Sequence, residues 1–170
     1  MADDSNRRAT DATGQDATGQ DALELLRRDH REVERLFGLF PHATVAQKDT
    51  FFEGIKHELD AHAAVEEELF YPALKAEGGE LAALVERARL EHFGLETLMA
   101  AIESMQPEDP RYDARVRELA DDVRKHVGEE EGRLFEMARQ RLGPARLRSL
   151  GERMAARKTG LRAEMADLAP

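Results

Sequence analysis

Apolar side chains recur every three or four residues in four successive stretches of the chain, and this spacing constrains the fold more than any other feature. It is typical of helices that bury one stripe against neighbouring helices. The stretches cover residues 23–40, 52–73, 81–102 and 112–137, and turns rich in Pro and Gly separate them. Connections of about four to eight residues force neighbouring helices to run antiparallel. The sequence therefore predicts an all-α, up-down-up-down four-helix bundle.

The length of 170 residues suits a single domain with tails. Residues 1–20 contain a tandem Asp-Ala-Thr-Gly-Gln repeat and almost no large apolar side chain, so we expect a disordered tail there. Residues 21–142 are the expected bundle. Residues 143–170, which begin at a Gly-Pro pair, are expected to form a short additional helix and tail.

The formal net charge of −10 argues against sequence-independent binding to nucleic acid, so we expect no nucleic-acid partner. Residues 141–162 are nevertheless basic and could bind an acidic protein partner. Alternatively, their apolar side chains pack on the bundle while the charged face meets solvent or the acidic bundle itself. The basic residues of this segment are Arg141, Arg146, Arg148, Arg153, Arg157, Lys158 and Arg162.

The chain has no Cys, which excludes disulfides and thiolate metal ligands. Any metal must therefore be held by His, carboxylate or Tyr side chains. The sequence contains neither a stretch of roughly 18 to 20 apolar residues nor the apolar segment of a signal peptide. We therefore expect a cytoplasmic protein that does not enter a membrane.

A histidine interrupts each apolar stripe near its middle. These four histidines are His30, His62, His92 and His126. Two glutamates, Glu66 and Glu130, occupy the same stripes one turn later. A single core histidine usually has an ordinary hydrogen-bonding role, but four at one level of a bundle need shared partners. Burying two carboxylates without cations would cost several kcal/mol each, and a bound cation removes that cost.

Other oxygen donors lie close to the stripes. Glu34 and Glu96 each follow a stripe histidine by four residues but lie on the flank of the stripe, where a solvated carboxylate is the ordinary interpretation. Tyr71 lies close to the second stripe and is either a ligand or part of the helix end. Glu131, beside Glu130, is an alternative to Glu130 as the carboxylate of the fourth helix, although the stripe favours Glu130. His42 and His57 lie off the stripes and are expected at the surface.

Taken together, these motifs resemble the hemerythrin-like, His-His-Glu cation-binding domains over about residues 22–140. The resemblance rests on an isolated His30, on His-Ala-Ala-Val-Glu-Glu followed by Leu-Phe-Tyr-Pro, on Glu-His92, and on His126 with Glu130 four residues later. It implies a non-haem di-iron centre with two iron ions (Fe²⁺/Fe³⁺), oxo- or hydroxo-bridged. The implied metal ligands are the terminal His30, His62, His92 and His126 and the bridging Glu66 and Glu130.

The sequence departs from the oxygen-carrying hemerythrins in the third helix. Those proteins have two histidines four residues apart, whereas here His92 is followed at that spacing by Glu96. An anionic or aqueous ligand in place of an imidazole favours the ferric state and leaves coordination more open. The resemblance therefore favours sensing of, or reaction with, dioxygen, nitric oxide or peroxide over reversible oxygen carriage.

Two other classes of function remain open on the sequence alone. A ferroxidase or iron-handling protein of the ferritin kind builds its site from Glu-x-x-His pairs, and no histidine of this chain has Glu three residues before it. A metal-free interaction bundle would use the same His and Glu residues as a pH-sensitive core. Phosphate-binding loops, serine nucleophile elbows and zinc-protease motifs do not occur, so we assign no turnover reaction.

Overall fold

The computed structural model describes residues 20–168, and these residues are helical throughout apart from short connections. The all-α prediction is confirmed, whereas the prediction for the N-terminal tail lies almost wholly outside the described residues. The helices are α1 (Ala22–Leu39), α2 (Val45–Val65), α3 (Tyr71–Lys75), α4 (Gly79–Glu103), α5 (Tyr112–Glu129) and α6 (Phe135–Leu168). A 3₁₀ turn, η1 (Phe40–His42), follows α1, and two π-helical turns, η2 (Glu66–Phe70) and η3 (Glu130–Leu134), precede α3 and α6.

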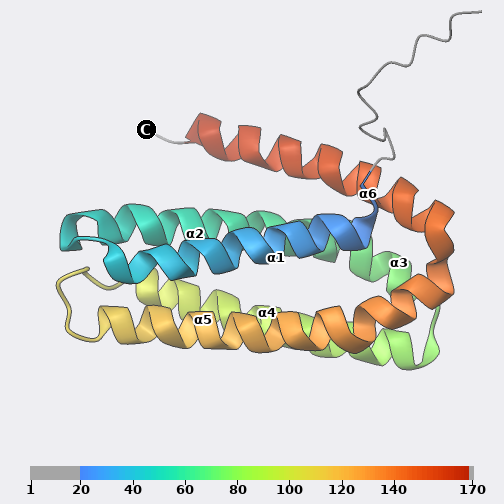
Figure 1. Cartoon of the computed structure of the whole chain (residues 1–170), viewed down its shortest axis with the longest axis horizontal. Coiled ribbons are helices and arrows are strands. Elements are labelled where there is room, and N and C mark those ends of the chain that lie inside the picture. The colour runs from blue at the N-terminus through green and yellow to red at the C-terminus, as the bar shows by residue number, and fades with distance from the viewer. Residues whose placement is uncertain (1–19, 169–170) are drawn as a thin grey trace, which may run out of the picture.

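The long helices α1, α2, α4 and α5 lie side by side in Figure 1 as the four rods of a bundle, with α1 packed on α2 and α4 packed on α5. The rod that starts with α2 continues through η2 into α3, and the rod that starts with α5 continues through η3 into α6. A capping box formed by Asp21 and Glu24 starts α1, and a second one at Thr44 starts α2. Gly78 and Gly79, with φ of 70° and 56°, supply the left-handed backbone that begins α4.

The apolar core is divided into two clusters by a layer of buried polar residues. In α1, Leu26 belongs to one cluster and Val33 to the other, with His30 between them. In the other three rods, too, the histidine lies between residues of the two clusters, so each of the four stripe histidines lies at the boundary between the clusters. The buried polar and charged residues are Asp29, His30, His62, Glu66, His92, His126, Glu130 and Lys158. The bundle therefore concentrates its buried polar groups in one layer.

The helix that follows Gly143 is longer than the short helix predicted. Gly143, with φ of 70°, breaks α6 before Pro144, and the chain then remains helical to Leu168. Leu147, Leu150 and Met154 recur every three or four residues and are all buried in the core. One face of this helix therefore packs against the bundle over successive turns. This C-terminal segment (residues 144–168) turns back at Gly143 and then lies along α1, in the same direction as α1 (Figure 1).

Many of the basic side chains of the C-terminal segment meet acidic groups of the same chain. The pairs formed are Arg146 with Glu77, Arg157 with Glu68, Lys158 with Asp29, and Arg162 with Glu58. Of the two interpretations of the basic residues 141–162, binding to an acidic partner or pairing with the acidic bundle, the second therefore describes these four residues. Within residues 20–168, no helix is both long enough and apolar enough to cross a membrane.

Candidate metal centre

Each long rod contributes one histidine to the buried polar layer, and the four rings meet as two pairs. The Nε2 atoms of His30 and His62, from α1 and α2, lie 3.2 Å apart. Those of His92 and His126, from α4 and α5, lie 3.1 Å apart. Two neutral rings share one N–H at this distance, whereas two charged rings repel each other. The same spacing suits two imidazole nitrogens that bind one cation.

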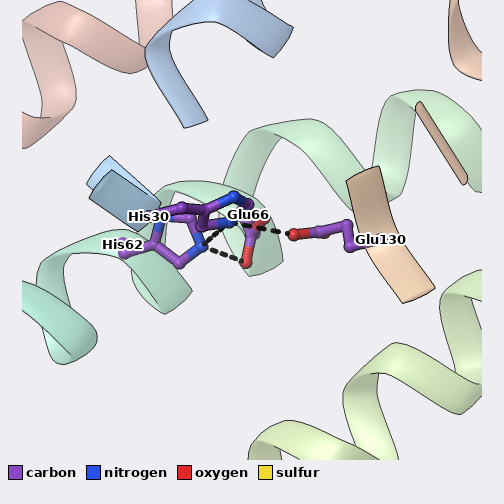
Figure 2. Close-up of side chains that lie close together, drawn as sticks. All are labelled: His30, His62, Glu66 and Glu130. Atoms are coloured by element: carbon purple, nitrogen blue, oxygen red, sulfur yellow. Dashed lines mark hydrogen bonds and ion pairs between the residues drawn. The ribbon is translucent and has the colours of Figure 1, made fainter. Parts of the chain in front are cut away.

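Two buried glutamates connect the histidine pairs. Glu66 Oε2 lies 3.2 Å from the Nε2 atoms of both His62 and His92. Glu130 Oε2 lies 3.3 Å from His30 Nε2 and 3.8 Å from His126 Nε2. Figure 2 shows His30, His62, Glu66 and Glu130 converging from three rods. The structure therefore brings all six residues predicted as metal ligands together, and each carboxylate contacts one histidine of each pair.

The local backbone at both glutamates is a π-helical turn, which the sequence analysis did not anticipate. Glu66 is the first residue of η2 and Glu130 is the first residue of η3. A π-turn inserts one extra residue into the helical hydrogen-bond ladder, and such turns occur frequently at functional sites. The two rods that carry a buried glutamate of the polar layer thus share the same local distortion.

The six residues form two sets of donors suited to cations. One set is His30, His62, Glu66 and Glu130, and the other is Glu66, His92 and His126, with the donor atoms of each set within 4.8 Å of one another. Glu66 Oε1 and Glu130 Oε2 are buried without a hydrogen-bond partner. An unpaired buried carboxylate oxygen is costly unless a cation or a donor reaches it. The residues present therefore fit a metal centre.

The pKa shifts of His62 and Glu66 also indicate that the site is stabilised by a positive charge. Burial opposes the charged form of His62, but Glu66 and Asp29 raise the pKa of its imidazole to about 10. Glu66 is also buried, yet the facing His62 and His92 hold the pKa of its carboxyl well below the usual value. Without a metal, a proton on His62 supplies the positive charge that the Glu66 carboxylate needs.

Comparison with known proteins identifies the family. The model of the hemerythrin HHE cation binding domain matches residues 21–138, a span that contains all six residues of the site. The chain belongs to the hemerythrin HHE family. A DNA nickase of Nostoc sp. is 34% identical over 120 residues, which are 70% of this chain and 34% of that protein. The chain therefore spans about a third of the length of that relative.

A solved structure shares the fold of this HHE domain. It is the crystal structure of a hemerythrin HHE cation binding domain-containing protein from Mycobacterium kansasii, with a TM-score of 0.76 and 26% sequence identity. The match covers 85% of this chain and 88% of that one. The resemblance therefore extends beyond the residues that the family model matches.

Tyr71 lies within the polar layer of this HHE domain. Its hydroxyl oxygen is 3.2 Å from Glu130 Oε1, 3.3 Å from Glu66 Oε2 and 3.3 Å from His92 Nε2. Burial and the two carboxylates raise the pKa of the phenol above its usual value, so the metal-free protein keeps this hydroxyl protonated. Tyr71 thus contacts donors of both sets, including three of the six predicted ligands.

Glu96 and Glu34 stay outside the cluster. Glu96 is exposed, although it lines the cavity beside the site. Glu34 is exposed and pairs with Arg124. The spacing of four residues that these glutamates share with Glu66 and Glu130 does not bring them to the site, because they lie on the flank of the apolar stripe. His42 and His57 are exposed as well.

Glu131 contacts the opposite side of a histidine from Glu130. Its Oε1 lies 2.7 Å from His30 Nδ1, whereas Glu130 faces His30 Nε2. The Glu131 side chain is one-third exposed and that of Glu130 is 1% exposed. Of these two neighbouring glutamates, only Glu130 therefore reaches the buried face of the site. The position of Glu130 on the apolar stripe had favoured it over Glu131, the alternative carboxylate of this helix.

A carboxylate also faces the outward Nδ1 of the other three histidines. The distances are 3.5 Å from Asp29 to His62, 3.6 Å from Glu67 to His92, and 2.9 Å from Glu91 to His126. A hydrogen bond from Nδ1–H to a carboxylate leaves the Nε2 lone pair free for a metal and orients the ring. These outer carboxylates were not predicted from the sequence, although Asp29 and Glu91 each directly precede a stripe histidine.

A cavity of about 300 Å³ adjoins the site. The four histidines line it together with apolar side chains from all four rods. These apolar residues include Val33, Leu59, Leu95, Met99, Val123 and Val127. The acidic residues that line it are Asp60, Glu67, Glu68 and Glu96. The histidine layer is thus accessible to a small ligand through a largely apolar space.

Proposed function

We propose that this chain holds two iron ions in the buried polar layer and binds dioxygen, nitric oxide or peroxide there. His30 and His62 would hold one ion and His92 and His126 the other, with Glu66 and Glu130 bridging them. Iron in such a donor set supplies redox chemistry and an open coordination position for a small ligand. The surrounding residues exclude bulk water from the site and orient the imidazoles.

The observation that carries the proposal is the shared contact of both glutamates. Glu66 lies at one distance, 3.2 Å, from a histidine of each pair, and Glu130 also contacts one histidine of each pair. A carboxylate that served one mononuclear site would contact one pair only. Two carboxylates shared in this way favour two cations that are close together.

Tyr71 supplies a further oxygen donor in this proposal. Its hydroxyl lies 3.3 Å from both Glu66 and His92, a separation typical of two donors on one metal ion. Glu96, which occupies the sequence position of the fifth imidazole of oxygen carriers, is exposed. An oxygen donor in place of an imidazole favours the ferric state, and this supports sensing or reactive chemistry over reversible oxygen carriage.

The metal content of matched histidine variants tests the proposal. We expect about two irons per chain, with oxo-bridge absorption, in aerobically purified protein. His62→Ala should lose iron, because it removes one of the two imidazole donors that His30 and His62 provide. His57→Ala is the matched control, since His57 is an exposed histidine on the same helix. Metal-free wild type that folds normally would contradict the proposal and favour the metal-free, pH-sensitive bundle.

The name of the Nostoc relative suggests DNA nicking as a second activity. The net charge of −10 opposes binding to the phosphate backbone, and many basic residues of the C-terminal segment already pair with acidic groups of this chain. We therefore propose small-ligand chemistry for this chain, and we expect supercoiled plasmid to remain intact in the presence of the iron-loaded protein.

A further inference from the structure

The outer carboxylate of each site histidine contacts a basic side chain. Three of these contacts lie near the surface, and they join Glu131 to Arg27, Glu67 to Arg89, and Glu91 to Arg87. The side chains of these six residues are between 22% and 58% exposed. Asp29, the outer carboxylate of His62, differs because both it and its basic partner, Lys158, are 4% exposed.

Lys158 reaches this position from the C-terminal segment. Its Nζ lies 2.6 Å from Asp29 Oδ1 on α1 and 3.3 Å from Glu58 Oε2 on α2. A lysine is almost never fully buried unless it is paired, because removing an ammonium from water is costly. The family model ends at residue 138, so Lys158 lies outside the segment that defines the HHE domain.

The two oxygens of Asp29 face different partners. Oδ1 contacts Lys158, while Oδ2 faces His62 Nδ1 at 3.5 Å. Neither Oδ2 nor Nδ1 has a hydrogen-bond partner, and both atoms are buried. The carboxylate is planar, so an ammonium that holds Oδ1 also determines where Oδ2 points. A small approach of the two unpaired atoms completes a hydrogen bond that orients the imidazole.

We propose that Lys158 is a positioning residue for the metal centre: it holds Asp29 so that Asp29 orients His62 with Nε2 toward the metal. The inference rests on the proposed metal function. It gives the C-terminal segment a role in the site, since the segment supplies the only buried lysine or arginine, among residues 20–164, that contacts an outer carboxylate. The role belongs to the half of the centre formed by His30 and His62.

Variants that remove charge distinguish two roles of Lys158: positioning Asp29 and His62, or only packing the C-terminal segment on the bundle. Lys158→Met leaves Asp29 as a buried, unpaired carboxylate, so it should weaken both the fold and metal binding. The double variant Asp29→Leu/Lys158→Met replaces the ion pair by apolar side chains of similar size, a change that is often neutral for stability. Arg162→Gln is the matched control, because Arg162 lies one turn later, pairs with Glu58 and is 53% exposed.

The measurement is anaerobic titration with Fe²⁺ against a chromogenic chelator, together with the melting temperature of each metal-free protein. We expect the double variant to melt like the wild type but to bind one of its two Fe²⁺ ions about 10- to 100-fold more weakly. Arg162→Gln should bind both as the wild type does. Wild-type affinity for both ions in the double variant would overturn the inference and leave Lys158 with a docking role alone. A wild type that binds no Fe²⁺ would overturn the proposed function as well.

Discussion

Glu66 Oε2 lies 3.2 Å from the Nε2 of His92, although the two residues belong to different rods of the bundle. Glu66 shares its own rod with His62, which lies at the same distance from the same oxygen. One carboxylate oxygen thus joins the two histidine pairs. Loss of this side chain is therefore expected to affect both halves of the centre, whereas loss of one histidine affects mainly its own half.

Truncation of the shared glutamates should remove metal. We expect Glu66→Ala and Glu130→Ala each to cost most of the second iron, because each variant removes a bridge between the two ions. Glu96→Ala should keep both irons, since Glu96 is exposed and lines only the cavity. Elemental analysis of the three purified variants checks the prediction. Full iron content in Glu66→Ala and Glu130→Ala, with loss in Glu96→Ala, would instead show that the Glu96 carboxylate is a primary ligand.

Glu131 provides a control within the same turn of helix as Glu130. Because Glu131 contacts the Nδ1 of His30, Glu131→Ala should retain both irons but bind them about 10- to 100-fold more weakly. Chelator competition measures this difference. If Glu131→Ala instead loses an iron outright while Glu130→Ala does not, Glu131 is the bridging carboxylate.

Removal of the metal should lower the melting temperature in a pH-dependent way. A ligand present at 100 times its dissociation constant stabilises the native state by about 2.7 kcal/mol. In the metal-free protein, Glu66 and Asp29 raise the pKa of His62, against the effect of burial, from 6.5 to about 10. Its stabilising charge is therefore fully present below pH 6.5 and is lost as the pH rises towards 10.

Glu66 behaves in the opposite sense, because His62 and His92 lower the pKa of its carboxyl despite burial. Its contribution is present above pH 4.5 and is lost as the pH falls through the lowered pKa. The metal-free protein should consequently be most stable between pH 5 and 6, where protons also compete with the metal. Melting curves should show a larger gap between loaded and metal-free protein at pH 8 than at pH 5.5. An equal gap at both values would count against a buried histidine site.

The sequence predicted the helices and the six central residues because both follow from one periodicity. His30, His62, Glu66, His92, His126 and Glu130 occupy stripe positions, and the stripe of a helix faces the core. The glutamates at the same spacing but off the stripe, Glu34 and Glu96, stayed outside the cluster. Position on the stripe was thus more informative than the interval between His and Glu.

Contacts that depend on tertiary packing were not predictable in this way. The π-turn that begins at Glu66 inserts an extra residue into the helix, and Tyr71, the residue that directly follows this turn, reaches the polar layer. Lys158 belongs to a basic segment whose charged face resembles an ordinary solvated surface. Its burial depends on how the C-terminal segment packs on α1, and local sequence patterns do not encode that arrangement.

Tyr71→Phe should change the spectrum of the iron-loaded protein more than its stability. The phenol lies within 3.3 Å of Glu66, Glu130 and His92, so coordination of its oxygen would add a phenolate-to-iron band in the visible range. We expect the variant to keep both irons and the fold but to lose this band. Identical visible spectra for wild type and variant would show that Tyr71 only hydrogen-bonds to the carboxylates.

Gly151→Ala should loosen the C-terminal segment. A Cβ at this position would clash with the carbonyl oxygen of Gln20 and would lie 2.7 Å from the amide nitrogen of Ala22. Both atoms belong to the backbone, so the helix must shift, at a cost of about 1–3 kcal/mol. Thermal unfolding should show a lower melting temperature. Gly160→Ala is the matched control, since its added Cβ would meet only the Arg157 side chain, at 3.8 Å.

Mössbauer spectroscopy of ⁵⁷Fe-loaded protein, with the iron content measured on the same sample, tests the central claim most directly. Two ferric ions that Glu66, Glu130 and an oxo or hydroxo bridge would join predict about two irons per chain in one magnetically coupled, diamagnetic diferric centre. One iron per chain, two uncoupled high-spin ferric ions, or a correctly folded protein that takes up no iron would contradict the account.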